Sequence, residues 1–94
     1  MPSETLVKDG PFLTMYYVYI LESIPYSDNF YTGWTDDLEQ RLLSHNSGAN
    51  KHTSKFKPWK IVWVGGFSDQ KKAIAFEKYL KTASGIAFRK KRLL

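Results

Sequence analysis

The amino-acid sequence predicts a mixed α/β domain of the α+β type, in which helices flank a three-stranded, largely antiparallel sheet. Two runs, residues 16–21 and 59–66, are almost continuously apolar, which is typical of strands covered on both faces. A polar, turn-rich loop separates the first run from another apolar stretch. Segments with apolar residues at helical spacing precede and follow the last strand. The expected order is therefore strand, strand, helix, strand, helix and a short final helix.

The first two strands are predicted to form an antiparallel hairpin. Residues 16–21 read YYVYIL and are aromatic or β-branched except for the last, while residues 22–29 (ESIPYSDN) are rich in turn residues. Residues 29–34 form the second strand, which Gly33 is expected to close. By the alternation of side chains along a strand, one face carries Tyr17, Tyr19 and Leu21, and the other carries Tyr16 and Val18.

Two helices are expected from their capping residues and apolar faces. Thr35 is a suitable N-cap for the first helix, which should run to about Asn46 before the polar, basic loop of residues 48–58. Ser68 is expected to cap the second helix and Gly85 to end it, and the basic tail that follows should add a last helical turn or two. The expected core side is Leu38, Leu42 and His45 in the first helix, and Ala73, Ile74, Phe76, Leu80 and Ala83 in the second.

A single domain is predicted over residues 15–94, after a flexible leader at residues 1–14 that shows no apolar period. The sequence contains no cysteine, which excludes disulfides and thiolate metal sites. No apolar run approaches the roughly 20 residues of a membrane span, and the start lacks the basic-then-apolar order of a signal peptide. We therefore expect a cytoplasmic protein with no membrane contact.

Charge is divided unevenly along the chain. Residues 1–50 carry two basic and seven acidic side chains, whereas residues 51–94 carry twelve basic and two acidic ones. A strongly basic half is typical of a surface that binds nucleic acid or an anionic membrane. A solvated, lysine-rich surface that only aids solubility is the alternative interpretation.

A few polar residues are candidates for chemistry. Glu77 lies at the margin of the apolar face of the second predicted helix, where a carboxylate needs an ion pair, hydrogen bonds or a metal. Pairing with a nearby lysine is the simplest of these interpretations. Arg41 lies beside His45 on its helix and suits a phosphate, although the rim of an ordinary amphipathic helix would also carry it. His45 and His52 match no standard metal spacing, and the tyrosines taken singly are packing residues.

Several short motifs occur in order across residues 16–93. They are Tyr17-Val18-Tyr19, Tyr31-Thr32-Gly33, Leu38-Glu39-Gln40-Arg41-Leu42, His45-Asn46-Ser47-Gly48, Lys51-His52-Thr53, the segment 75–80 around Glu77, and the tail 85–93. Each is weak alone, but in this order the sequence resembles the GIY-YIG nuclease family, particularly its small standalone members and the amino-terminal domain of the excision-repair incision subunit. Tyr17 and Thr32 stand where the family motifs have Gly and Ile.

The resemblance implies a role for each matching residue. Tyr19 would help to activate the attacking water, and Arg41 would stabilise charge on the phosphate. Glu77 would ligate a single divalent metal ion, Mg²⁺ or Mn²⁺. The remaining positions are Tyr31 in the same hydroxyl network or against the scissile phosphate, His45 and His52 around that phosphate, and Gly33, which would leave room for the backbone to approach.

The implied function is a metal-dependent endonuclease that hydrolyses DNA phosphodiester bonds, with DNA repair among the roles that the resemblance suggests. Specificity for branched or single-stranded DNA, or a partner protein that supplies it, is left open, because no base-reading motif is present. The alternative is a catalytically weak nucleic-acid-binding or repair-complex interaction module on the same fold. The residues expected to contact the DNA backbone are Lys51, Lys55, Lys57, Lys90, Lys91 and Arg92.

Overall fold

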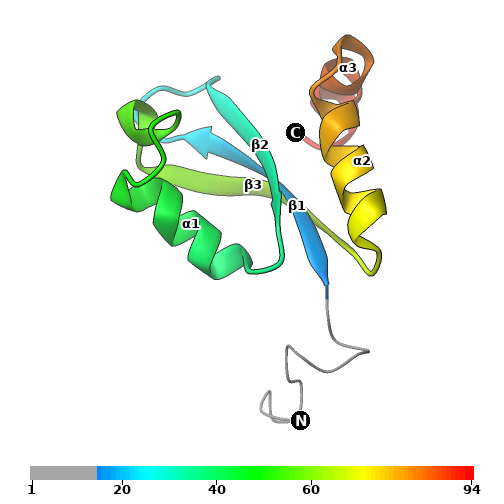
Figure 1. The fold of residues 1–94 in the computed structure, drawn as a ribbon. Coiled ribbons are helices and arrows are strands. Elements are labelled where there is room, and N and C mark those ends of the chain that lie inside the picture. Colours follow the sequence, from blue (N-terminus) through cyan, green and yellow to red (C-terminus); the bar gives the residue numbers. More distant parts are fainter. Residues whose placement is uncertain (1–14) are drawn as a thin grey trace, which may run out of the picture.

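The computed structural model describes residues 15–94, in which helices surround a three-stranded sheet (Figure 1). The elements are β1 (Tyr16–Ser23), β2 (Phe30–Thr35), α1 (Leu38–Ser47), the short 3₁₀ helix η2 (Ser54–Phe56), β3 (Trp59–Phe67), α2 (Gln70–Leu80) and α3 (Ala83–Arg92). Both strand pairs are antiparallel, and the order β2-β1-β3 makes β1 the central strand. The α+β fold and the element order predicted from the sequence are confirmed. The leader predicted at residues 1–14 lies outside the described residues.

Helices cover both faces of the sheet, with α1 on one side and the α2–α3 pair on the other (Figure 1). Tyr19 and Leu21 of β1 are buried in a cluster that includes residues of α1. Val18 and Ile20 are buried in a second cluster that includes residues of α2. This alternation confirms the predicted parity of the first strand. None of the helices in residues 15–94 is long and apolar enough to cross a membrane.

The residues that cap α1 and α2 lie after the ones predicted from the sequence. Asp37 rather than Thr35 caps α1, because its carboxylate accepts a hydrogen bond of 3.2 Å from the Gln40 N–H. The Thr35 hydroxyl instead accepts one of 3.0 Å from the N–H of Asp37. Asp69 rather than Ser68 caps α2 in the same way. In both helices a carboxylate next to the positive end of the helix dipole is a stronger acceptor than the neutral hydroxyl before it.

The chain after α2 forms a longer helix than the one or two turns predicted. The helix α3 has ten residues, and the Thr82 hydroxyl caps it by accepting a hydrogen bond of 3.1 Å from the Gly85 N–H. Gly85 therefore does not end α2 but lies in the first turn of α3, where a side chain would overlap the carbonyl group of Tyr79. Ala83, which was expected in the core of the second helix, is exposed at the start of α3. Because α3 starts directly after α2, Ala83 belongs to the new helix rather than to the core face of α2, and Gly85 packs against the backbone at the end of α2.

Candidate active site

The side chain of Tyr19 crosses the neighbouring strand at a glycine. Tyr19 is paired with Gly33 in the ladder between β1 and β2, and both residues are buried. A β-carbon at Gly33 would lie 2.6 Å from the Tyr19 hydroxyl oxygen and 3.1 Å from Cε2 of Tyr31. Gly33 lies inside β2 rather than closing it as predicted, because the strand continues to Thr35. The missing side chain at this position leaves the space that the Tyr19 ring fills.

Helix α1 carries His45 to the same face of the sheet. Leu38 and Leu42 pack into the core cluster of β1 on this side, and His45 follows them on the predicted face of the helix with no exposed surface. The helix ends at Gly48, whose φ of 84° lies in the left-handed region that favours glycine. This turn directs the chain into the loop that contains Thr53.

A chain of hydrogen bonds runs from the Tyr19 hydroxyl through His45 to this loop. Tyr19 Oη lies 3.0 Å from His45 Nε2, and His45 Nδ1 lies 2.9 Å from Thr53 Oγ1. The Thr53 hydroxyl donates to the carbonyl of Asn50 over 3.4 Å. The indole N–H of Trp59 donates to the Thr53 carbonyl over 2.9 Å and so ties the loop to β3. Tyr19, His45 and Thr53 are each at most 1% exposed, so the chain is shielded from solvent.

Tyr31 of β2 connects this buried chain to the surface. Its ring centroid lies 4.7 Å from that of His45 and 6.3 Å from that of Tyr19. Tyr31 is half-buried, so the aromatic cluster reaches solvent at this side chain. The structure therefore brings together Tyr19, Tyr31, His45 and Gly33, all of which were singled out in the sequence.

Burial and neighbouring charges keep Tyr19 and His45 in their neutral forms. Burial raises the pKa of Tyr19 most, Tyr31 raises it further, Arg41 lowers it, and Glu77 raises it. Burial, and then the positive charge of Arg41, lower the pKa of His45 below the ordinary value of 6.5. At neutral pH the pair is therefore a phenol and an uncharged imidazole.

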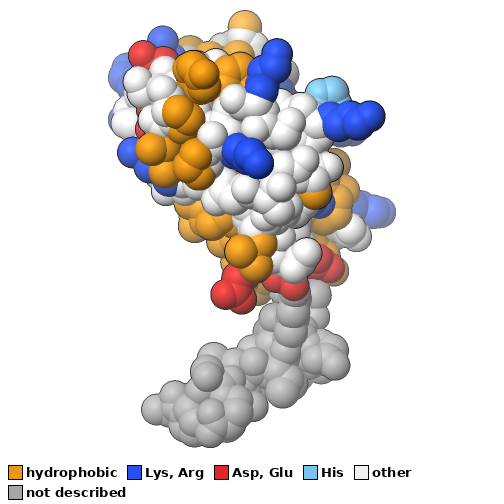
Figure 2. All heavy atoms as spheres, turned by 90° about the vertical axis from the view of Figure 1, so that its left-hand side faces the viewer, with side chains coloured by type: hydrophobic (Ala, Val, Ile, Leu, Met, Phe, Trp, Pro, Cys, Tyr) orange, Lys and Arg blue, Asp and Glu red, His pale blue; other side chains and the backbone are white. Residues whose placement is uncertain are grey.

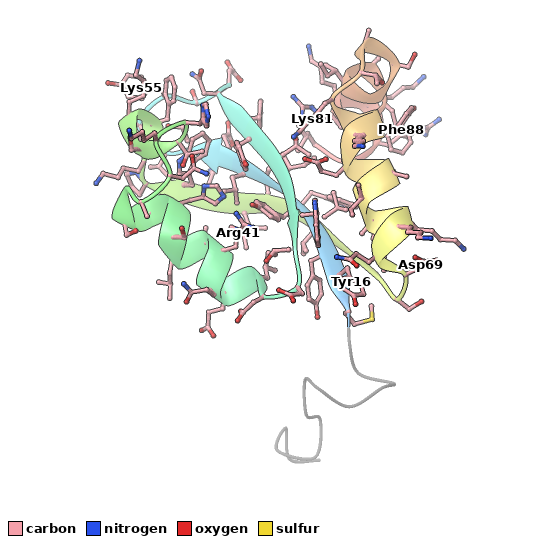
Figure 3. All side chains as sticks on the ribbon, viewed as in Figure 1. Tyr16, Arg41, Lys55, Asp69, Lys81 and Phe88 are labelled. Carbon is pink, nitrogen blue, oxygen red and sulfur yellow. The ribbon has the colours of Figure 1, made fainter. Side chains whose placement is uncertain are left out.

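Arg41 is exposed on α1, on the side of the helix that faces the sheet (Figure 3). Its charge acts on the pKa values of both Tyr19 and His45, so the guanidinium lies within electrostatic reach of the hydrogen-bonded chain. It also lines an open cavity of about 300 Å³ at the start of α1, together with Thr35, Asp36, Asp37, Gln40 and Ser44. An anion near Tyr19 would therefore meet a permanent positive charge from this side.

Glu77 is 9% exposed and forms an ion pair with Lys81, one helical turn later, through Oε2 and Nζ. The lysine pairing considered from the sequence is therefore present. The carboxylate also acts electrostatically on Tyr19. Within residues 15–94, no group of three or more His, Cys, Asp or Glu side chains is placed to hold a metal ion. Glu77 fits Mg²⁺ or Mn²⁺ only as a single carboxylate that shares the ion with water and phosphate oxygens.

The remaining predicted residues lie outside this cluster. His52 is exposed in the loop after α1, where its backbone N–H donates to the Asn50 side chain over 2.9 Å. Lysine and arginine side chains are spread over the face that carries α1 and this loop (Figure 2). The predicted DNA-contacting residues form two exposed groups on different elements, with Lys51, Lys55 and Lys57 in the loop after α1 and Lys90, Lys91 and Arg92 at the end of α3.

Three residues of this region were given no role in the sequence. Thr53 occurs in a polar loop, where nothing indicates that it is buried against a histidine. Lys81 follows Glu77 by four residues, and that spacing alone indicates an ion pair along a helix. Arg89 donates from Nη1 to Thr32 Oγ1 over 2.8 Å. The two residues of that last contact are 57 positions apart, so no local pattern could reveal it.

A neutral Tyr–His pair, with an arginine and a buried carboxylate in electrostatic reach, defines a candidate site for chemistry on a phosphate ester. Comparison with known families agrees with this class. The GIY-YIG catalytic domain family matches residues 15–91, and the chain belongs to this family.

Individual relatives are similar to most of the chain. A UPF0213 protein of Clostridium perfringens is 40% identical over 68 residues, which is 71% of each protein. A UPF0213 protein of Streptococcus pneumoniae is 36% identical over 66 residues, covering 69% of this chain and 65% of the relative. A solution NMR structure of a UPF0213 protein from Bacillus halodurans has a TM-score of 0.48 at 30% identity, covering 79% of this chain and 80% of that one.

One further relative has a name that states a function, and the similarity covers only a small part of that protein. A Giardia intestinalis homologue of the structure-specific endonuclease subunit SLX1 is 35% identical over 65 residues. The match covers 65% of this chain but only 18% of the Giardia protein.

The lowered pKa of His45 predicts a pH-dependent contribution to stability. Below about pH 6.5 the unfolded chain protonates His45 while the folded chain does not, so the free energy of unfolding should decrease as the pH falls through this value. His45→Gln should lose this component, and the exposed control His52→Gln should retain it. Urea unfolding of the three proteins between pH 5 and 8 measures the effect. Equal pH slopes for the parent and His45→Gln would contradict it.

Proposed function

We propose that the chain is a metal-dependent endonuclease that hydrolyses DNA phosphodiester bonds. Membership of the GIY-YIG catalytic domain family supports this class of reaction. The observation that carries the proposal is the buried hydrogen bond of 3.0 Å between the Tyr19 hydroxyl and His45 Nε2. A tyrosine with a raised pKa serves as a base only when a second group can take its proton. His45 is in position to be that group.

The hydrogen bonds around His45 favour one of its two neutral tautomers. The proton of the Thr53 hydroxyl is directed to the Asn50 carbonyl, so Thr53 Oγ1 acts as an acceptor toward His45 Nδ1–H. A neutral imidazole protonated at Nδ1 has a lone pair at Nε2. In this tautomer His45 Nε2 accepts the Tyr19 proton, and the attacking water would have to reach Tyr19 Oη from the side of Tyr31, where the cluster meets solvent.

These roles give a proton relay for hydrolysis. As a water oxygen forms a bond to phosphorus, its proton moves to Tyr19 Oη and the Tyr19 proton moves to His45 Nε2. The bond from phosphorus to the leaving oxygen breaks, and that oxygen takes up a proton from solvent. His45 becomes an imidazolium, and its lowered pKa returns the proton readily. The same lowered pKa keeps His45 in its proton-accepting form at neutral pH.

Arg41 and Glu77 provide the charges that a phosphodiester requires. The guanidinium of Arg41 would pair with a nonbridging phosphate oxygen and stabilise the charge that develops there. Glu77 would hold a divalent ion, which when bound supplies Lewis-acid stabilisation of the phosphate. In the structure Lys81 neutralises the Glu77 carboxylate, so this lysine would have to give way to the ion.

DNA is the expected partner of this site. The exposed lysines of the loop after α1 lie on the same side of the sheet as Tyr19 and His45 and would contact the backbone of a bound strand. The Giardia relative is named as a subunit of a structure-specific endonuclease, which favours branched DNA as the first substrate to test. A binding module without activity is the alternative, but it would have no use for a buried carboxylate near an anionic ligand.

Tyr19→Phe tests the relay, because it removes only the hydroxyl. Single-turnover cleavage of supercoiled plasmid and of flapped and branched DNAs, with Mg²⁺ or Mn²⁺, should slow by about 10²–10⁴-fold, the usual contribution of general acid–base catalysis. DNA affinity should not change. Tyr16→Phe, on the opposite face of β1, should cleave at the parental rate. Parental cleavage by Tyr19→Phe would exclude the relay.

Glu77→Gln tests the metal site. Cleavage should fall by orders of magnitude, because the amide does not hold the divalent ion, while DNA binding should persist or tighten as a negative charge is lost. EDTA should abolish cleavage by the parent protein. Glu39→Gln removes an equal charge from the exposed side of α1 and should have no effect. A parental rate for Glu77→Gln, or cleavage in EDTA, would refute the assignment.

A further inference from the structure

A second cationic pocket lies next to the candidate active site, between the edge strand β2 and the α2–α3 pair. Its volume is about 260 Å³. Two of its lining residues are positively charged, and Thr32 contributes a hydroxyl group. The lining residues are Phe30, Tyr31 and Thr32 of β2, Lys81 after α2, and Ile86 and Arg89 of α3.

Arg89 is fixed in this pocket by neutral partners. Its Nη1 donates to Thr32 Oγ1 over 2.8 Å, and its Cζ lies 5.8 Å from the centroid of the Phe30 ring. Its Nε–H is buried and has no hydrogen-bond partner in the structure. No carboxylate within residues 15–94 forms an ion pair with this guanidinium. A half-buried cation with an unused donor is costly to maintain unless an anion completes it.

Lys81 contributes the second positive charge at the pocket. Figure 3 shows Lys81 on the side of α2 that faces β2. Its ammonium group pairs with Glu77, so it links the pocket to the carboxylate of the candidate metal site. An ammonium group has three donors, and the ion pair leaves capacity for another acceptor.

Tyr31 places this pocket beside the reacting centre. It lines the pocket, and its ring centroid is 4.7 Å from that of His45. The hydrogen-bonded chain and the pocket therefore share one neighbouring residue, Tyr31, on the edge strand β2. A nucleic-acid strand that presents one phosphate near Tyr19 would carry a neighbouring phosphate toward the pocket.

We propose that Arg89 and Lys81, with the hydroxyl group of Thr32, form a subsite for a second backbone phosphate of the strand that is cut. This inference rests on the proposed endonuclease function and extends it to the positioning of the substrate. The basic residues predicted from the sequence on α3 were Lys90, Lys91 and Arg92, whereas the residue of this helix in the pocket is Arg89. The subsite would set the register of the strand without reading its bases.

Ile86→Glu tests the subsite without removing a residue that holds the fold. Ile86 is 39% exposed at the pocket, so a glutamate there would repel a phosphate while remaining solvated. Ala87→Glu is the matched control, since it makes the same change of charge at an exposed position next to the pocket residue. Binding of a single-stranded oligonucleotide in EDTA, followed by fluorescence anisotropy over a range of salt concentrations, measures the difference without cleavage.

The slope of log Kd against log salt concentration should fall by about 0.7 in Ile86→Glu, the value for one phosphate contact to a single strand. Ala87→Glu should keep the parental slope. Arg89→Gln should act like Ile86→Glu. The arginine Nε–H resonance of Arg89 should shift in NMR spectra of the parent when the oligonucleotide is added.

Three outcomes separate this inference from the function on which it rests. If the parent binds the oligonucleotide and Ile86→Glu has the same slope as Ala87→Glu, the subsite is excluded and the endonuclease proposal stands. If Ile86→Glu shows the loss but the parent does not cut DNA, the subsite is supported and the endonuclease proposal fails. If the parent does not bind the oligonucleotide at any salt concentration, the subsite is overturned, and cleavage of the plasmid and branched DNAs decides the endonuclease proposal separately.

Discussion

The Tyr19 ring occupies space that exists only because the opposite residue on β2 is glycine. A β-carbon at Gly33 would lie 2.6 Å from the Tyr19 hydroxyl oxygen, which is too close for any packed arrangement. With that space filled by the ring, the hydroxyl reaches His45 on α1 and passes beside Tyr31 on the edge strand. The hydrogen-bonded chain through His45 of α1 to Thr53 starts at this close approach.

The electrostatic environment then determines what the pair can do. Burial raises the pKa of Tyr19, and burial together with Arg41 lowers that of His45, so neither group is charged at neutral pH. A stable phenolate would repel a phosphate permanently, and a stable imidazolium would bind it permanently. Two neutral, hydrogen-bonded groups can instead accept a proton only while the reaction proceeds. The permanent charges are carried by the surrounding groups, where Lys81 balances Glu77 and Arg41 is exposed.

Periodicity predicted the parts of this arrangement that depend on burial. The alternating direction of side chains along residues 16–21 assigned Tyr19 to one face of the sheet, and the spacing of Leu38 and Leu42 placed His45 on the helix face that packs there. The order of the motifs indicated the family that the comparisons then showed. Contacts made by loops and by the last helix could not be found in this way. The burial of Thr53 depends on the fold of a polar loop, and the approach of Arg89 to Thr32 depends on how α3 packs.

The tautomer of His45 tests the relay most directly, because the direction of proton transfer depends on it. Long-range ¹H–¹⁵N correlation NMR at neutral pH distinguishes the two neutral forms of a histidine. We predict that Nδ1 carries the proton and donates to Thr53, and that Nε2 is unprotonated and accepts from Tyr19. A proton on Nε2 would mean that His45 donates to Tyr19, and Tyr19 could not then act as the base that activates water.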